Sequence, residues 1–217
     1  MSPARVARQA RERGLDLIAV CDHNSAENAE ATARAGRKVG LAVIGGMEIT
    51  SREEVHVLGL FREPGLLGAA QQAVHDHLPG ENDPDVFGEQ LVMDEDDRVI
   101  GRQDKLLIGA TDLTLADVVR TVHALGGIAI ASHVDRPSYS ILSQLGFIPA
   151  GLGLDGVEIR DRRPDGLPDA LPVVSSSDAH RLEEIGRRRT SFYVEGPTAE
   201  EIALALKGAG GRRVLTG

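Results

Sequence analysis

The sequence contains very little cysteine and few aromatic residues. It has one cysteine and no tryptophan, and aromatic side chains make up only 3% of its 217 residues. A single cysteine excludes a disulfide within the chain and fits a reducing compartment, so we expect a cytoplasmic protein. With so few aromatic rings, any core that this chain builds must be mostly aliphatic.

Long apolar runs and an excess of positive charge are also absent. No run reaches the ~18 residues of a membrane span, and no signal peptide precedes the first helical pattern, so we expect no membrane association. The net charge of −9 argues against an extended nucleic-acid footprint, although a local basic or metal-lined pocket could still bind phosphate. The length is enough for a sizeable core and favours a single domain over residues 1–217.

The most informative stretch is residues 15–21, a nearly continuous apolar run that ends at Asp22 and His23. Such a run is typical of a strand that is covered on both faces. Folds of the α/β class present reactive groups at the carboxyl ends of their strands. Two later runs repeat the pattern, because 128–132 precedes His133 and 172–177 precedes Asp178 and His180. We therefore expect three strand ends to face one mouth.

Strands and helices alternate along the chain. Apolar periodicity predicts helices at 3–13, 26–39, 66–78, 115–125, 138–145 and 198–207. It predicts strands at 15–21, 41–46, 55–61, 128–132, 155–159, 172–177 and 190–194. Residues 79–103 differ, since a polar loop is followed by two short strands around an acidic turn, and we interpret this segment as an insertion at the rim. In a β/α barrel an opening helix implies a preceding strand, which this sequence does not contain.

Six side chains at predicted strand ends combine imidazole and carboxylate groups. Four histidines with two carboxylates suit Zn, Mn or Fe better than Mg or Ca. Each residue taken singly is an ordinary polar residue at the end of a strand, and it is the set that predicts a metal site. The set consists of His23, Glu48, His56, His133, Asp178 and His180.

The other histidines and the cysteine are not expected to bind metal. His75 and His77 form an H-x-H pair, but they lie in a helical pattern, where residues two apart point in different directions. His123 lies on the predicted helix 115–125 and is interpreted as a packing or surface residue. Cys21 is interpreted as a small buried residue.

Four segments together resemble the PHP family, the polymerase and histidinol phosphatase domain. They are, in order, GLDLIAVCDHN, GMEITSREEVHVLGLF, ASHVDRPSYSILSQLGF and SSDAH. The resemblance implies a distorted seven-stranded β/α (TIM-like) barrel with two or three divalent metal ions at its mouth. It implies that the six residues above are the metal ligands, that Glu48 bridges two ions, and that Asp22 orients His23.

The chain departs from the family pattern at its beginning. PHP proteins carry an H-x-H motif on a strand before the helix with which this chain opens, and that strand is missing here. A misassigned start codon and a genuine short form both fit the sequence. Without the two histidines we expect one metal position to be weakly held, and the unpaired strand edge to favour homo-oligomers or aggregation.

The resemblance implies a metal-dependent phosphoesterase, that is, a phosphatase or phosphodiesterase acting on a small phosphorylated metabolite or nucleotide through metal-activated water. His133, Asp178 and His180 are the expected catalytic residues, and the choice of general base between Asp178 and metal-bound hydroxide stays open. Arg136 could reach a phosphate oxygen or serve in a surface ion pair. Two alternatives remain: a degenerate, non-catalytic binding module, and a polymerase-associated nuclease, which the acidic charge disfavours.

Overall fold

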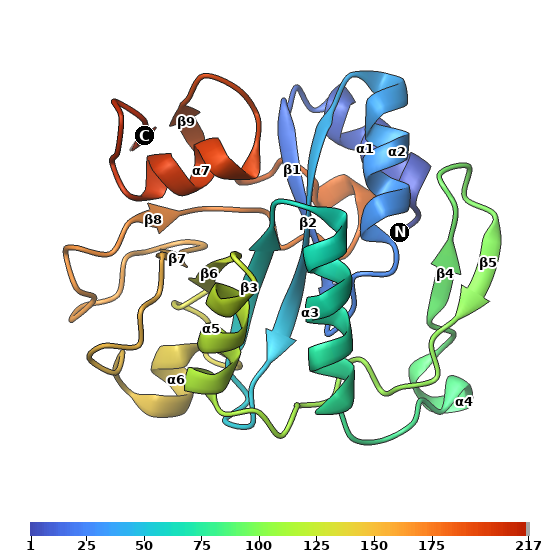
Figure 1. Cartoon of the computed structure of the whole chain (residues 1–217), viewed down its shortest axis with the longest axis horizontal. Helices are drawn as coiled ribbons and strands as arrows, with labels where there is room; N and C mark the ends of the chain where they lie inside the picture. The colour runs from blue at the N-terminus through green and yellow to red at the C-terminus, as the bar shows by residue number, and fades with distance from the viewer. Residues whose placement is uncertain (216–217) are drawn as a thin grey trace.

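A curled sheet of six strands forms the centre of the structure, a computed structural model that describes residues 1–215 (Figure 1). From one edge to the other, the strands are β1 (Leu17–His23), β2 (Ala42–Thr50), β3 (His56–Phe61), β6 (Ile128–Ala131), β7 (Gly156–Glu158) and β8 (Val173–Val174). The α/β class is confirmed. The sheet has six strands within residues 1–215 and stays open between β1 and β8, as an incomplete barrel would, whereas the seven-stranded arrangement that the resemblance implied is not confirmed.

The strand expected at 190–194 does not join this sheet. It forms as β9 (Ser191–Tyr193) and pairs antiparallel with β10 (Arg213–Leu215), a short strand that was not predicted. The resulting two-stranded sheet packs with α7 (Ala199–Leu206) at the C-terminal end of the chain (Figure 1). Within residues 1–215, the segment predicted as a seventh strand of the main sheet therefore belongs to a separate two-stranded sheet.

A helix forms in each region where apolar periodicity predicted one, and two short helical elements, at 84–87 and 182–184, form where none was predicted. The remaining helices are α1 (Pro3–Glu12), α2 (Ala29–Val39), α3 (Pro64–Asp76), α4 (Pro84–Phe87), α5 (Leu115–Ala124), α6 (Ile141–Leu145) and the 3₁₀ turn η1 (Leu182–Glu184). At the start of α5, Thr114 and Asp117 form a reciprocal capping box. Within residues 1–215, no helix combines the length and apolarity that crossing a membrane requires.

Strand direction changes twice within the sheet. β1 and β2 are parallel, β3 is antiparallel to both β2 and β6, and β6, β7 and β8 are parallel. Only residues 51–55 connect β2 to β3. A parallel pair needs a crossover of about a dozen residues or more, so this short connection forces the chain to turn back on itself.

The segment between α3 and α5 forms a hairpin beside the sheet. Its strands are β4 (Leu91–Met93) and β5 (Val99–Arg102), within the predicted insertion (Figure 1). Two ion pairs tie its acidic turn to α2, with Arg34 Nε 2.8 Å from Glu95 and Lys38 Nζ 2.6 Å from Asp96. The acidic turn therefore contacts the basic end of α2.

The core is aliphatic, as the composition predicted. Its main cluster lies between the sheet and helices α3 and α5, and Phe61 is its one buried aromatic residue among those described. Close packing reaches the backbone at Gly46, where a Cβ would lie only 2.7 Å from the carbonyl oxygen of Gly59 and 2.8 Å from Cys21 Sγ. Gly46 therefore lets β1, β2 and β3 pack closely just before the polar ends of β1 and β2.

Candidate metal centre

Three histidines surround the carboxylate of Glu48. His56 Nδ1 lies 3.1 Å and His133 Nε2 lies 3.3 Å from Glu48 Oε1, while His23 Nδ1 lies 3.3 Å from Oε2. Glu48, His56 and His133 are all buried. The two oxygens of one buried carboxylate thus face different imidazoles, with two rings on one side and one ring on the other.

The antiparallel direction of β3 brings His56 to this group. His23 ends β1, Glu48 lies near the end of β2 and His133 follows β6, whereas His56 is the first residue of β3. Because β3 is antiparallel to its neighbours, its beginning lies at the edge where theirs end, and His56 pairs with Thr50. The cluster therefore combines the carboxyl ends of three elements with the amino end of a fourth.

The environment favours an anionic Glu48 and a neutral His23. Burial raises the pKa of the Glu48 carboxyl, but the contacts with His133 and His56 outweigh it and hold that pKa well below its usual range. Burial lowers the pKa of His23. A carboxylate with neutral imidazoles is the protonation state that a metal ion requires.

The donor atoms fit a transition metal ion. His23 Nδ1, His56 Nδ1 and both ring nitrogens of His133 are buried and have no hydrogen-bond partner among residues 1–215. Two ligand atoms about 2.0–2.1 Å from a tetrahedral zinc ion lie about 3.3 Å apart, which is the spacing seen around Glu48. One atom each from His23, Glu48 and His56 also lies within 4.8 Å of the others. Nitrogen and carboxylate donors of this kind suit Zn, Mn or Fe.

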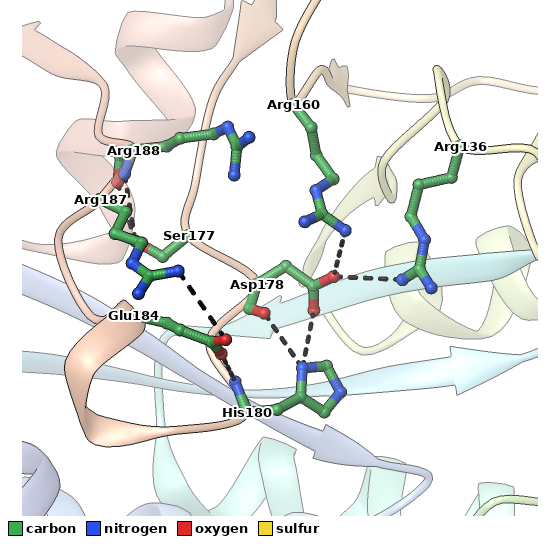
Figure 2. A pocket seen from close by; sticks show the side chains of 8 residues that line it. All are labelled: Arg136, Arg160, Ser177, Asp178, His180, Glu184, Arg187 and Arg188. Atoms are coloured by element: carbon green, nitrogen blue, oxygen red, sulfur yellow. Dashed lines mark hydrogen bonds and ion pairs between the residues drawn. The ribbon is translucent and has the colours of Figure 1, made fainter.

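Asp178 and His180 lie beside this cluster. The rings of His180 and His23 are 6.0 Å apart between centroids, and His180 is largely exposed. Asp178 Oδ2 faces two guanidinium groups, 3.2 Å from Arg136 Nη1 and 3.5 Å from Arg160 Nη1 (Figure 2). The expected catalytic pair thus borders the imidazole cluster on one side and basic residues on the other.

Two site residues have a left-handed backbone. His133 has a φ of 27° and Asp178 a φ of 44°, in a region where non-glycine residues carry a cost of about 1–3 kcal/mol. Local strain of this kind is common at functional sites. The surrounding contacts must hold both turns in place.

A basic pocket of about 360 Å³ opens next to Asp178 (Figure 2). Arg160 Nε is buried there and has no hydrogen-bond partner among the described residues. In a chain of net charge −9, four arginines against two carboxylates make this pocket locally basic. The pocket is lined by Arg136, Arg160, Ser177, Asp178, His180, Glu184, Arg187 and Arg188.

The remaining sequence-predicted residues lie elsewhere. Asp22 contacts Asn28, and its side chain is exposed. Successive residues of a strand point to opposite faces, so this carboxylate lies away from His23. His75 contacts Gln71 on α3, His77 pairs with Asp112 just after that helix, and His123 on α5 pairs with Asp155.

Sequence reasoning missed three residues near the cluster. The ring of Tyr139 stacks on His56 with centroids 4.9 Å apart, Arg160 contacts Asp178, and Glu158 is a buried carboxylate beside His133. Glu158 lies within the predicted strand 155–159, so the rule that drew attention to other polar residues near strand ends could have identified it. Nothing in the local sequence marks Tyr139.

Comparison with known proteins supports the resemblance to the PHP family. The sequence model of the PHP-associated family matches residues 170–209, the segment that contains Asp178 and His180. A 5'-3' exoribonuclease of Haemophilus influenzae is 22% identical over an alignment of 173 residues, and the match covers 61% of this chain and 63% of that protein. A phosphoribosyl 1,2-cyclic phosphate 1,2-diphosphodiesterase of Eggerthella lenta is 32% identical over 66 residues, 28% of this chain and 25% of that protein.

Solved structures share the fold across nearly the whole chain. A lesion-specific endonuclease from Pyrococcus furiosus has a TM-score of 0.73 at 19% identity and covers 99% of this chain. This chain spans 53% of that endonuclease, which is about half its length. A metal-dependent phosphoesterase from Bifidobacterium adolescentis, itself described as putative, has a TM-score of 0.59 at 18% identity and covers 94% of this chain and 91% of its own. The open sheet of the described chain is therefore a PHP-like fold.

Proposed function

Because the chain resembles the PHP family in its motifs and fold, we propose that it is a metal-dependent phosphoesterase acting on a small phosphorylated metabolite or a nucleotide. The observation that carries the proposal is the convergence of three imidazoles on Glu48 beside a pocket lined by arginines. Nitrogen and oxygen donors suit the metal, and guanidinium groups suit a phosphate ester.

The proposed ligands form two groups on either side of Glu48. His56 and His133, which face Oε1, would hold one ion, and His23, which faces Oε2, would hold a second together with His180. When bound, Zn, Mn or Fe ions lower the pKa of water and polarise a phosphoryl oxygen. Arg136 and Arg160 donate hydrogen bonds to the phosphate oxygens, and Asp178 accepts the proton of the attacking water as general base. His180 Nδ1, 3.7 Å from Asp178 Oδ1, helps to orient that carboxylate.

A nuclease activity is the second candidate. It is favoured by the similarity to an exoribonuclease and to an endonuclease whose structure has been determined with a 27-mer duplex that contains an abasic lesion. The net charge of −9 opposes a long contact with a phosphate backbone, so such an activity would act through the basic pocket on a short stretch of strand.

The test is a set of assays on the chain after chelation and reloading with Mn²⁺ or Zn²⁺. The substrates are p-nitrophenyl phosphate, bis(p-nitrophenyl) phosphate, a 5'-phosphorylated single-stranded RNA and a duplex DNA with an abasic site. Metal-dependent release of nitrophenol, lost in His56→Ala and kept in His75→Ala/His77→Ala, is the expected result. Cleavage of the oligonucleotides alone would favour the nuclease. Phosphate binding without turnover of any substrate would favour the non-catalytic binding module.

A further inference from the structure

Glu158 is a buried carboxylate to which the proposed function gives no role. It ends β7, is 1% exposed, and forms no ion pair with a basic side chain within residues 1–215. A carboxylate in such a position is costly unless several donors satisfy it. Its contacts therefore identify what it holds in place.

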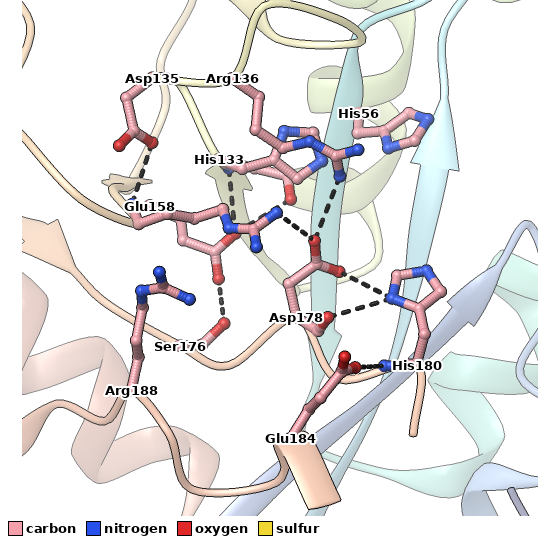
Figure 3. Close-up of polar contacts among 12 residues, drawn as sticks. His56, His133, Asp135, Arg136, Glu158, Ser176, Asp178, His180, Glu184 and Arg188 are labelled. Atoms are coloured by element: carbon pink, nitrogen blue, oxygen red, sulfur yellow. Dashed lines mark hydrogen bonds and ion pairs between the residues drawn. The ribbon is translucent and has the colours of Figure 1, made fainter. Parts of the chain in front are cut away.

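Three donors from two neighbouring segments converge on this carboxylate (Figure 3). The backbone N–H of His133 donates at 3.0 Å and the hydroxyl of Ser132 lies at 3.1 Å, both at Oε2, while the hydroxyl of Ser176 donates to Oε1. The backbone carbonyl of Glu158 also accepts from the N–H of Val134 at 2.8 Å. Glu158 thus binds the segment from Ser132 to Val134 from both its side chain and its backbone.

This anchorage fixes the direction of the His133 ring. His133 is fully buried, has a φ of 27°, and directs Nε2 toward Glu48. A left-handed backbone at a non-glycine residue persists only where neighbouring contacts impose it. The N–H bond to Glu158 is such a contact, because it holds the peptide group on which that turn depends.

Ser132 lies between the two carboxylates. Its hydroxyl oxygen lies 2.9 Å from Glu48 Oε1 as well as 3.1 Å from Glu158 Oε2. A hydroxyl has one proton and donates to one carboxylate at a time. The backbone N–H of His133 and the hydroxyl of Ser176 satisfy Glu158 whichever carboxylate Ser132 serves, so the direct bond to His133 carries the anchorage.

We propose that Glu158 is a positioning residue of the metal centre: it holds the backbone of His133, and with it the His133 ring, in the arrangement that binds the ion. Partners behind the ligands commonly change metal affinity by about 10–100-fold when they are altered. The inference rests on the metal-dependent function proposed above, and its test therefore measures metal binding rather than turnover.

The experiment is a titration of the metal-free chain with Co²⁺. Calorimetry measures the affinity, and the visible absorption of the bound ion reports on the ligand geometry. Glu158→Gln keeps the size of the side chain but replaces one accepting oxygen with an NH₂ group. That group would face the N–H of His133 or the hydroxyl of Ser176, which are both donors. We expect it to bind Co²⁺ about 10–100-fold more weakly and to shift the absorption bands, because the ligand geometry changes. Thermal unfolding of the metal-free variants is followed in parallel.

Asp155→Asn is the matched control. Asp155 also links β6 to β7, accepting from the N–H of Ala129 at 2.9 Å and lying 2.8 Å from His123 Nε2, but it stands at the opposite end of these strands from His133. We expect its Co²⁺ affinity and spectrum to match those of the unaltered chain. Equal weakening in both variants would overturn the proposal, because it would indicate general loosening of the two strands.

Two further outcomes separate this inference from the function on which it rests. Unchanged Co²⁺ affinity and spectrum in Glu158→Gln would overturn the positioning role and leave the proposed function standing. Failure of the unaltered chain to bind Co²⁺ would overturn both. If Glu158→Gln does not fold, Glu158→Asp provides the test, since it keeps the charge but shortens the side chain that reaches the N–H of His133. Unchanged binding there would equally refute the proposal.

Discussion

His56 Nδ1 lies 3.1 Å from Glu48 Oε1, although His56 begins its strand and Glu48 lies near the end of its own. The contact depends on the reversal of the chain over residues 51–55. The histidines of the sequence therefore fall into two groups, those near Glu48 and those on or beside helices. The two groups should differ in how their mutation affects metal content.

Loss of His56 should remove metal, whereas loss of the H-x-H pair at His75 and His77 should not. We expect His56→Ala to lower the metal content measured by elemental analysis, since one of the imidazoles beside Glu48 Oε1 is gone. His75→Ala/His77→Ala should keep the full content, because these rings contact Gln71 and Asp112. Equal loss in both variants would mean that the metal site lies elsewhere.

The basic pocket should determine affinity for phosphate esters. A charge-assisted hydrogen bond contributes about 1.5–3 kcal/mol, so we expect Arg160→Ala to lower kcat/KM for p-nitrophenyl phosphate by about 10–100-fold. The control is Arg120→Ala on α5, where the guanidinium is 72% exposed and pairs with Asp117. A similar decrease in both variants would argue that Arg160 acts on general stability and not on the substrate.

The metal-free chain should lose stability as the pH falls. Burial lowers the folded-state pKa of His23 below its ordinary value of about 6.5, so the unfolded chain binds more protons in this range. The contribution of His23 is therefore complete above about pH 6.5 and is lost as the pH falls toward the folded-state pKa. Glu48, whose pKa is also lowered, adds a loss in the same direction below about pH 4.3.

Thermal unfolding between pH 8 and pH 4 in the presence of a chelator measures this dependence. His23→Gln should flatten the decrease in Tm between pH 7 and pH 5. A Tm of the unaltered chain that rises on acidification would contradict the prediction.

The free edge of β1 should promote self-association. β1 pairs only with β2 within residues 1–215, and residues of β1 itself line an apolar pocket of about 510 Å³. A lysine on an edge strand discourages pairing with another chain, so Ala19→Lys should lower the average mass measured by light scattering. Ala150→Lys, which adds the same charge at an exposed alanine in a turn, should not. A monomeric unaltered chain would refute the expected homo-oligomer.

Most helices and strands could be predicted because apolar periodicity records which side of each element is buried. The helix 115–125 is a clear case, since Thr114 and Asp117 mark its beginning and the structure has α5 at Leu115–Ala124. The apolar pattern of a strand does not depend on its direction, so the pattern at 55–61 could not show that β3 is antiparallel to its neighbours. The strand at 190–194 was predicted, but its pairing with β10 was not, because pairing depends on partners distant in the sequence.

The candidate site was predictable to the extent that it follows strand ends. The structure brings His23, Glu48, His56 and His133 together, as the motifs predicted, whereas the roles of these four residues and of Asp178 and His180 in metal binding stay predictions. Contacts that depend on tertiary packing could not be read from the sequence. The ring of Tyr139 on His56 and the two arginines on Asp178 belong to this class.

Glu48 and the three histidines around it come from segments that span more than a hundred positions of the chain, from His23 to His133. An unfolded chain cannot bring these donors together, so a metal ion would bind the folded state and leave the unfolded state almost untouched. At a free metal concentration one hundred times its Kd, such an ion adds about 2.7 kcal/mol to the free energy of unfolding. The supply of metal would then govern the lifetime of the folded protein as well as its chemistry, and a cell short of the ion would lose the protein to proteolysis sooner.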